Sequence, residues 1–306
     1  MARYKIDLIC PLYKAEKYIE DLHKSLLMQS GSFDLNIKYV LTKVEKDNTE
    51  NILKRINAHY KAIKPEEFSH SLTREKEAFE SNGDVIVFIT QDIIIRDSSW
   101  LEKLTSPIIR KECEASFSRQ ICENKSIERY TRINNYPEDS RIVSKDDIER
   151  LGIMTFFFSD AASAVDNKIF KELNGYDAKN LLTNEDMYFA HKLINSGYRI
   201  KYCADAQVIH SHDYKFSELF KRYFDQGVFL KQNSYLAKYR ANESAFKLLR
   251  LVLVKSLVEG NLKAFFNVIP NFAARFLGNS YGKKYDKLSR NKIKKYSSNK
   301  YYWENN

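Results

Sequence analysis

The first half of the chain alternates between short apolar runs and segments with helical periodicity. The apolar runs cover residues 4–10, 36–42 and 84–90. Between and after them, helices are predicted for residues 16–29, 49–60, 72–81 and 98–109. Alternating strands and helices predict a parallel sheet that is covered by helices on both faces. We therefore expect an α/β fold of the doubly wound, Rossmann-like type.

In such sheets, ligands bind at the carboxyl ends of the strands. Three ends of this kind are predicted, at residues 10–13, 42–43 and 90–92. At the third, one carboxylate, Asp92, closes an otherwise apolar run. A lone acid in this place commonly caps a turn or a helix. The alternative is a ligand to a divalent cation, because Mg²⁺ is held by one or two carboxylates together with substrate phosphates.

The second half of the chain is less regular. Its polar stretch 114–149 is expected to be rich in loops, and residues 151–159 are expected to form a strand. The next predicted elements are a short helix at 167–177, an amphipathic helix from 184 to Gly197, a strand–turn–strand unit at 198–212 and helices from 215 to about 277. The last residues, rich in Lys, Ser and Asn, are expected to be poorly ordered.

Two further pairs of polar residues could carry chemistry. Glu185 and Asp186 stand in the first turn of a predicted helix, where acids favour the helix dipole. Alternatively, one of them is a general base that takes a proton from an attacking hydroxyl. His210 and His212 alternate along a predicted strand end, so both imidazoles point to one face. They either begin a polar loop or supply a metal ligand with a second polar group behind it.

In their order along the chain, these features resemble the family 2 inverting glycosyltransferases of the GT-A fold. The resemblance lies in residues 10–30, 70–93, 156–177, 184–200 and 208–212. These segments are similar to the family's first strand and helix, its nucleotide-sugar loop and DxD strand, its acceptor-side segment, its base-bearing helix and its metal-binding His. The resemblance implies a GT-A catalytic domain with a mostly parallel central sheet at 1–227. A basic extension of C-terminal helices would follow at 228–306.

The resemblance also implies a role for each candidate residue. Asp92 and His210 would hold Mg²⁺ or Mn²⁺ on the diphosphate of a nucleotide-sugar donor, and Asp186 would deprotonate the acceptor hydroxyl. Donor contacts would come from Pro11, Tyr13, Thr42, Arg74 and Gln91, and the acceptor side would hold Ser159, Asp160, Glu185 and His212. Two of these have simple alternatives: Arg74 could be a solvated helix-face residue, and Tyr13 could belong to the core.

Departures from the family pattern bear on the donor. Thr90 stands where the first acid of the DxD motif is usual, and Asp92 stands in place of the second. This form is similar to that of bacterial rhamnosyltransferases of cell-wall polysaccharide synthesis, which use dTDP-rhamnose. A deoxyribose lacks the 2′-hydroxyl that the first acid would bind. We therefore expect transfer of L-rhamnose to a lipid-linked saccharide, with a UDP-hexose donor as the alternative. Thr42-Lys43 stands where many members of the family carry an Asp that holds the nucleotide base. Ser159-Asp160 stands where Asn is more frequent.

The charge of the chain is concentrated at its C-terminal end. Residues 245–306 hold 13 basic and three acidic residues, which accounts for the whole net charge of +10, and the remainder has 37 of each. The apolar stretches there are too short to span a bilayer. They resemble an interfacial amphipathic element, which implies a cytoplasmic protein bound peripherally to an anionic membrane surface, on the inner face of the plasma membrane. The alternative is a helical cap with a solvated basic tail.

Other features narrow the class of protein. The four cysteines form no CxxC pair, so a reducing compartment without disulfides or zinc is expected. The first residues lead straight into a strand, without a predicted signal peptide. A nucleic-acid-binding protein would explain the basic tail with its Tyr and Phe residues. The neutral body argues against it, and no nucleic-acid partner is expected. A catalytically inactive scaffold is a further alternative, because the DxD motif is incomplete.

Overall fold

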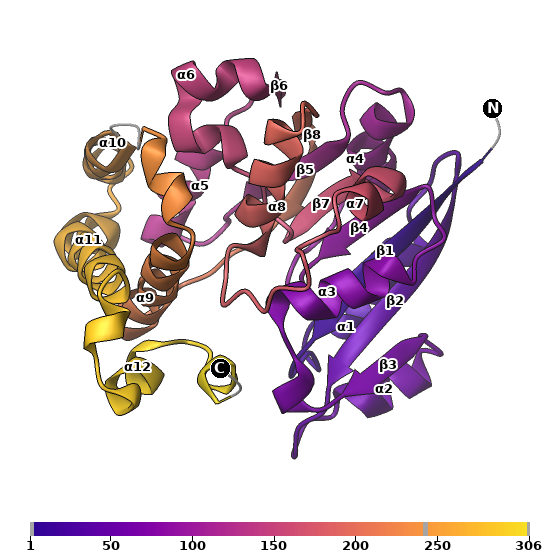
Figure 1. Ribbon diagram of the computed structural model, residues 1–306, viewed down its shortest axis with the longest axis horizontal. Coiled ribbons are helices and arrows are strands. Elements are labelled where there is room, and N and C mark those ends of the chain that lie inside the picture. Colours follow the sequence, from indigo (N-terminus) through magenta and orange to yellow (C-terminus); the bar gives the residue numbers. More distant parts are fainter. Residues whose placement is uncertain (1–2, 241–243, 305–306) are drawn as a thin grey trace.

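A single mixed sheet forms the centre of the molecule. The computed structural model describes residues 3–240 and 244–304. The strand order is β3-β2-β1-β4-β7-β5-β8-β6, in which β7 is antiparallel to β4 and β5, and β6 is antiparallel to β8. The other pairs are parallel, which confirms the predicted sheet (Figure 1). The strands are β1 (Tyr4–Leu12), β2 (Phe33–Thr42), β3 (Tyr60–Ile63), β4 (Val85–Ile89), β5 (Ala115–Ile121), β6 (Arg141–Val143), β7 (Ala162–Asp166) and β8 (Ile200–Ile209).

Helices cover both faces of this sheet. One core layer lies beneath α1 (Ile19–Leu27), α2 (Thr49–Arg55) and α4 (Trp100–Ile109). The other lies beneath α3 (His70–Phe79), α7 (Asn167–Glu172) and α8 (Glu185–Asn195). Alternate residues of β4 enter opposite layers, Val87 the first and Phe88 the second, because successive side chains of a strand point to opposite faces. Burial on both sides explains the continuous apolar run of this strand.

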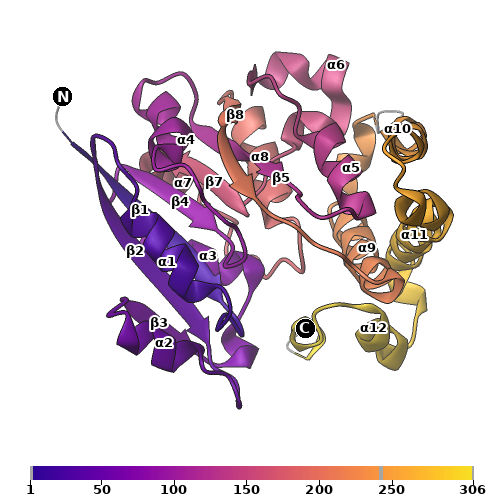
Figure 2. The same cartoon turned by 180° about the vertical axis from the view of Figure 1, so that it is seen from behind.

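The C-terminal part consists of helices packed beside the sheet (Figure 2). The remaining helices are α5 (Ile127–Asn135), α6 (Ile148–Leu151), α9 (Phe216–Gln232), α10 (Ser244–Val258), α11 (Leu262–Gly282) and α12 (Arg290–Tyr296). Short 3₁₀ turns occur at Pro65–Glu67, Lys145–Asp147, Gly152–Phe156, Ser234–Lys238, Tyr285–Lys287 and Tyr301–Trp303. The predicted boundary after residue 227 falls inside α9. No helix within the described residues is both long and apolar enough to span a membrane.

Helices α9 and α11 approach each other at glycines. A Cβ atom added to Gly282 would collide with the carbonyl oxygen of Phe224, and one added to Gly278 would collide with that of Phe220. Gly227 of α9 has the same relation to the carbonyl oxygen of Asn279. Glycine therefore allows the two backbones to meet without an intervening layer of side chains.

The expectation of loops at 114–149 was wrong, because this stretch contains the inner strand β5 and helix α5. Three polar side chains of β5, those of Ser116, Ser118 and Gln120, are buried, yet each has a partner. Ser116 donates from Oγ to the carbonyl of Leu104 at 2.6 Å, and Ser118 accepts from Nε1 of Trp100 at 3.0 Å. Because these partners lie on α4, the composition of the strand does not reveal them, and its polar residues suggested a loop.

Three other local predictions were also wrong. Residues 151–159 form the end of α6 and a 3₁₀ turn, because Gly152 adopts a positive φ of 56° and a strand, β7, begins only at 162. Residues 200–209 form one strand, in which a bulge opposite Ser118 and Arg119 replaces the expected turn. The C-terminal tail is ordered against α9, since Tyr302 and Trp303 are buried in a cluster with Phe224. All four cysteines are buried free thiols.

Candidate active site

Three side chains of the types that bind metal ions converge where β4 and β8 end. Asp92 follows β4, and His210 and His212 follow β8. The Nε2 atoms of the two imidazoles lie 2.7 Å apart. Oxygen atoms of Asp92 lie 3.5 Å from Nε2 of His210 and 3.8 Å from Nε2 of His212. All three ligand atoms therefore surround one point, as a metal site requires.

Gln120, a buried residue of β5, orients His210. Its side-chain oxygen accepts from Nη1 of Arg132 at 2.5 Å and lies 2.8 Å from Nδ1 of His210. A guanidinium can only donate, so this oxygen is identified as an acceptor, and Nδ1 of His210 must carry the proton. The lone pair of Nε2 is then directed at the shared point with Asp92. Support of this kind behind a metal-binding His is usual in metal sites.

The electrostatics of the three residues favour a bound cation. Burial, and then the electrostatic interaction with His210, lower the pKa of His212 to about 3, so that this imidazole is neutral near pH 7. Burial alone would raise the pKa of Asp92, but its interactions with His210, whose place a bound cation would take, lower it instead. The site thus offers an ionised carboxylate and a neutral imidazole. Such mixed oxygen and nitrogen donors fit Mn²⁺ better than Mg²⁺, which prefers oxygen alone.

A second group of residues places three carboxylates together at the start of α8. Asp186 is partly buried and accepts from the backbone N–H of Met187 at 2.7 Å. Burial, and then the charges of Glu185 and Asp160, raise its pKa well above the ordinary range of a carboxylic acid. A raised pKa makes a carboxylate a stronger proton acceptor, which suits a general base.

Arg74 of α3 lies among these acids and is only 4% exposed, which excludes the alternative of a solvated helix-face residue. It forms an ion pair with Glu185 at 3.1 Å and donates to the carbonyl of His70 at 2.9 Å. Burial opposes its charge, but Glu185 and Asp160 raise its pKa overall. Its Nε has no hydrogen-bond partner among the described residues, which leaves one buried donor for a ligand.

The candidate metal ligands and the group of acids are connected through β5. Besides holding His210, Gln120 donates from Nε2 to Oγ of Ser159 at 2.9 Å. The next residue, Asp160, accepts from Ser163 and from the hydroxyl of Tyr176, both at 2.7 Å. Ser159 and Asp160 are therefore part of the framework that joins the two groups.

The remaining predicted residues lie at the ends of β1, β2 and β4. The side chain of Gln91 accepts from the N–H of Tyr13 at 2.7 Å and donates to its carbonyl at 2.9 Å, which ties two strand ends together. The side chain of Tyr13 is 49% exposed, which excludes a core position. Thr42 is buried, and its hydroxyl has no partner within the described chain. Pro11 is half-buried.

Reasoning from the sequence missed several residues around this site. Gln120 and Arg132 belong to the stretch that was expected to be loops. Tyr214 stacks on His212, with ring centroids 4.7 Å apart and planes at 24°. Tyr214 could have been identified from the sequence, because it continues the alternation of His210 and His212 along the chain.

The sequence of the chain is similar to those of known glycosyltransferases. The sequence pattern described as Glycosyl transferase family 2 matches residues 7–173. The O-antigen chain rhamnosyltransferase WbaN of Salmonella anatum is 34% identical over 87% of this chain and 85% of its own. The O-antigen chain rhamnosyltransferase RfbN of Salmonella typhimurium is 33% identical over 98% of this chain and 96% of its own.

Solved structures share the fold. The mannosyltransferase PcManGT from Pyrobaculum calidifontis, in complex with GDP-Man and Mn²⁺, covers 99% of this chain and 86% of its own, with a TM-score of 0.54 and 12% identity. TarS of S. aureus, residues 1–349, covers 92% of this chain and 91% of its own, with a TM-score of 0.54 and 15% identity.

The sheet order and the similar solved structures identify the fold as the GT-A fold of glycosyltransferases. The chain belongs to glycosyl transferase family 2. This confirms the fold, the family and the enzyme class predicted from the sequence, together with the resemblance to bacterial rhamnosyltransferases.

Proposed function

We propose that this glycosyltransferase moves L-rhamnose from dTDP-rhamnose to a lipid-linked saccharide, with inversion and with the help of a divalent cation. The convergence of Asp92, His210 and His212 carries the proposal, because it supplies a cation site where a donor diphosphate would lie. The names of the two Salmonella relatives support rhamnose as the sugar and a cell-surface polysaccharide as the product. Thr90 in place of the first acid of the motif supports a deoxyribose nucleotide.

Different residues of the chain have different roles in the proposed reaction. Asp92, His210 and His212 would hold Mn²⁺ or Mg²⁺, which neutralises charge on the departing nucleoside diphosphate. Asp186 takes the proton of the acceptor hydroxyl as that oxygen bonds to the anomeric carbon. The bond from this carbon to the diphosphate breaks on the opposite side, and its electron pair leaves with the diphosphate. Attack and departure on opposite sides invert the anomeric configuration.

Arg74 and the strand ends prepare the donor side. The unpaired buried Nε of Arg74 can donate to an anionic oxygen of the donor, and a charge-assisted bond of this kind is strong. Pro11, Tyr13, Thr42 and Gln91 would shape the nucleotide pocket. The exposed ring of Tyr13 and the unpartnered hydroxyl of Thr42 are available to a base or a ribose.

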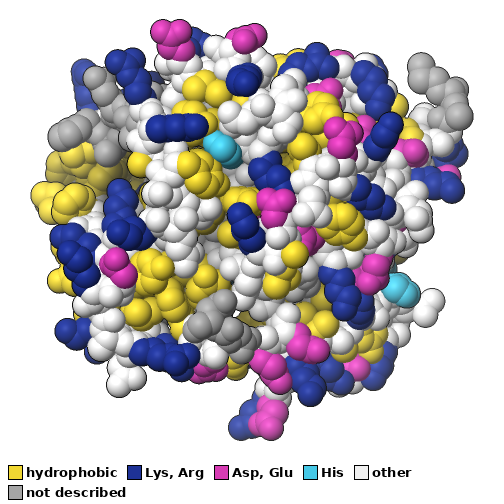
Figure 3. Space-filling view, in the orientation of Figure 1, with side chains coloured by type: hydrophobic (Ala, Val, Ile, Leu, Met, Phe, Trp, Pro, Cys, Tyr) yellow, Lys and Arg dark blue, Asp and Glu magenta, His cyan; other side chains and the backbone are white. Residues whose placement is uncertain are grey.

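The exposed apolar side chains of α10 and α11 support attachment to the inner face of the plasma membrane. On α11, Phe266, Ile269 and Phe276 are 73%, 77% and 73% exposed, and on α10 Val258 is 81% exposed. Apolar and basic side chains gather over these helices at the left of Figure 3. An interfacial helix needs both, apolar area for insertion and cations for anionic headgroups. We refer to Leu262, Phe266, Ile269 and Phe276 as the apolar stripe.

Binding of nucleotides in the presence of Mn²⁺ tests the donor. Thermal unfolding of the whole chain is followed with dTDP or with UDP, because a ligand that binds only the folded state raises the unfolding temperature. We expect a larger shift with dTDP, and loss of the shift when a chelator replaces Mn²⁺. A larger shift with UDP would reject rhamnose and favour a UDP-hexose donor. Shifts that are equal with and without chelator would reject the metal site.

A further inference from the structure

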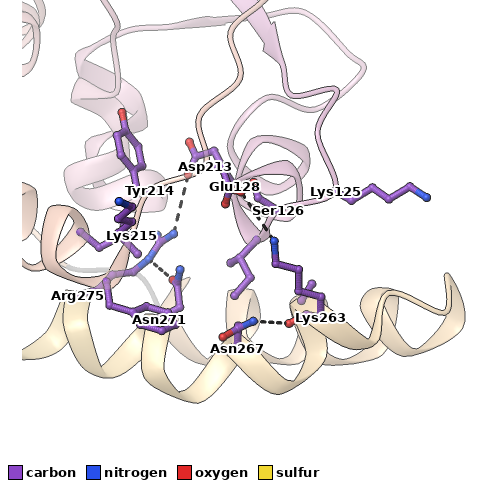
Figure 4. A pocket seen from close by; sticks show the side chains of 14 residues that line it. Lys125, Ser126, Glu128, Asp213, Tyr214, Lys215, Lys263, Asn267, Asn271 and Arg275 are labelled. Atoms are coloured by element: carbon purple, nitrogen blue, oxygen red, sulfur yellow. Dashed lines mark hydrogen bonds and ion pairs between the residues drawn. The ribbon is translucent and has the colours of Figure 1, made fainter.

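A cavity of about 370 Å³ lies next to the candidate active site, outside the residues assigned so far. It is enclosed by the start of α5, the segment that joins His212 to α9, and one side of α11 (Figure 4). Four cations line it, namely Lys125, Lys215, Lys263 and Arg275. Two acids, Glu128 and Asp213, also line it, which leaves a positive balance.

The cations of the cavity are held to different degrees. Arg275 is buried, donates to Asn271 at 2.8 Å and to the hydroxyl of Tyr223 at 2.7 Å, and so belongs to the wall. Lys263 only approaches Asp213 at 4.0 Å, and both side chains are largely exposed. An exposed pair of this kind contributes little, so Lys263 can exchange it for a ligand. Lys215 is exposed as well, at the start of α9.

The cavity is connected directly to the metal-binding residues. Tyr214, which lines it, stacks on the ring of His212, and Ser126 donates from Oγ to the carbonyl of His212 at 3.1 Å. One aromatic ring therefore separates the cavity from the candidate metal site. A molecule that occupies the cavity therefore lies within one ring's thickness of the candidate metal site.

Helix α11 presents two different faces side by side. Lys263, Asn267, Asn271 and Arg275 recur every four residues and line the cavity. Leu262 and Phe266 each precede a member of this row and are exposed to solvent as part of the apolar stripe. A cationic cavity thus borders an exposed apolar surface on one helix. A ligand that matches both must join an anionic group to an apolar chain.

We infer that this cavity binds the phosphate or diphosphate through which the acceptor saccharide is joined to its lipid, with the lipid lying along the apolar stripe. The inference rests on the proposed function, of which it specifies the acceptor. Lys215 and Lys263 contact the phosphate oxygens, and the saccharide extends past Tyr214 toward Asp186. A purely apolar ligand would make no use of the lysines of the cavity, and free phosphate would make no use of the apolar stripe.

Calorimetric titration of the whole chain with farnesyl diphosphate tests the inference. A chelator is present throughout, so that the diphosphate cannot bind through a metal at Asp92. The variant Lys215→Gln/Lys263→Gln is compared with Lys283→Gln/Lys284→Gln, which removes the same charge outside the cavity. We expect affinity to fall roughly tenfold per lysine in the first variant, since a charge-assisted bond is lost each time, and to stay unchanged in the second.

Inorganic pyrophosphate and farnesol separate the two parts of the ligand. Each should bind more weakly than farnesyl diphosphate, and only pyrophosphate should respond to the loss of Lys215 and Lys263. Equal losses in both double variants would overturn the inference in favour of diffuse attraction by the basic helices. Farnesol binding as well as farnesyl diphosphate would overturn it in favour of an apolar site.

Nucleotide binding by the same variant distinguishes a failure of this inference from a failure of the donor proposal. The Lys215→Gln/Lys263→Gln variant should bind dTDP with Mn²⁺ as tightly as the parent protein. Should dTDP not bind the parent, while farnesyl diphosphate depends on the two lysines, the donor proposal fails and the lipid-phosphate site stands. Should both ligands weaken together in this variant, the cavity is part of the donor site and the inference is wrong.

Discussion

Arg74 and Glu185 form an ion pair of 3.1 Å that is buried beside Asp186. The charge of Glu185 is one cause of the raised pKa of Asp186, because two carboxylates in one place resist ionising together. Glu185→Gln removes this charge and frees Arg74, and both changes lower the pKa of Asp186. We expect the acid limb of the pH profile of kcat/KM to move to lower pH.

The profile is measured with Glu16→Gln, a surface substitution, as the control. Movement of the limb to higher pH, or none, would show that Glu185 does not act on the base. The variant should also be less stable by about 3–5 kcal/mol, as is typical when one partner of a buried ion pair is removed.

Asp186→Asn keeps the shape of the side chain and removes the proton acceptor. We expect kcat to fall by about 10²- to 10⁴-fold, the usual contribution of a general base, while dTDP binding in Mn²⁺ is retained. Single-turnover transfer and nucleotide titration measure the two effects separately. A variant that transfers at nearly the parent rate would exclude Asp186 as the base.

Gln120→Leu removes the acceptor that holds the Nδ1 proton of His210. We expect Mn²⁺ affinity to fall about 10- to 100-fold, as is typical for a residue that supports a metal ligand. Electron paramagnetic resonance of free Mn²⁺ measures this without any substrate. Gln120→Glu keeps the acceptor and should lose less affinity than Gln120→Leu. Equal losses in the two variants would indicate a packing role.

Replacing Phe266, Ile269 and Phe276 by Ser tests the membrane role without disturbing the fold, because all three side chains are largely exposed. We expect the parent to sediment with phosphatidylglycerol vesicles at low salt, and the triple variant to remain in solution. Leu27→Ser, at an exposed apolar position on α1, is the matched control. Sedimentation of the triple variant like the parent would assign vesicle binding to the basic residues alone.

Asp225 of α9 couples the attachment of the C-terminal tail to pH. It accepts from the N–H of Ser298 at 2.9 Å, and burial raises its pKa to about 6 against an ordinary value of 3.8. The folded state therefore binds this proton more tightly than the unfolded state, and stability falls as pH rises from about 4 to 6. The cost above pH 6 is on the order of 3 kcal/mol.

Asp225→Asn should remove this cost. We expect its free energy of unfolding in urea to exceed that of the parent at pH 7.5, with the difference shrinking toward pH 4.5. Asp205→Asn, at an exposed position, should show no such trend. A gain that is the same at both pH values would mean that ionisation of Asp225 is not its cause.

The parts of the fold that could be predicted are those with local signals. Val85–Ile89 is buried on both faces, so its apolar run identified β4, and the position of Asp92 at its end followed from the strand. Strand β5 had no such signal, because the partners of Ser116, Ser118 and Gln120 come from other parts of the chain. Burial of a polar side chain depends on tertiary contacts, which composition does not reveal.

The site was predictable in the same uneven way. Its acids and imidazoles are recognisable by type and spacing, and the structure brings Asp92, His210 and His212 together. The support by Gln120 and the ion pair of Arg74 depend on which helices face which strands. The order of the tail depended on Tyr302 and Trp303, two aromatic residues within a polar stretch.

The glycine contacts between α9 and α11 determine how closely the two helices approach each other. At Gly227, Gly278 and Gly282 the backbones of the two helices meet without side chains between them, and α9 follows β8 and His210 along the chain. We therefore expect the apolar stripe and the candidate catalytic residues to keep a fixed separation. If the proposed attachment through this stripe holds, the candidate catalytic centre would lie at a constant height above the bilayer, and the distance between the lipid and a hydroxyl of the glycan would decide whether that hydroxyl is reached. Under the proposed function, acceptor hydroxyls nearer to or farther from the lipid would be out of its reach.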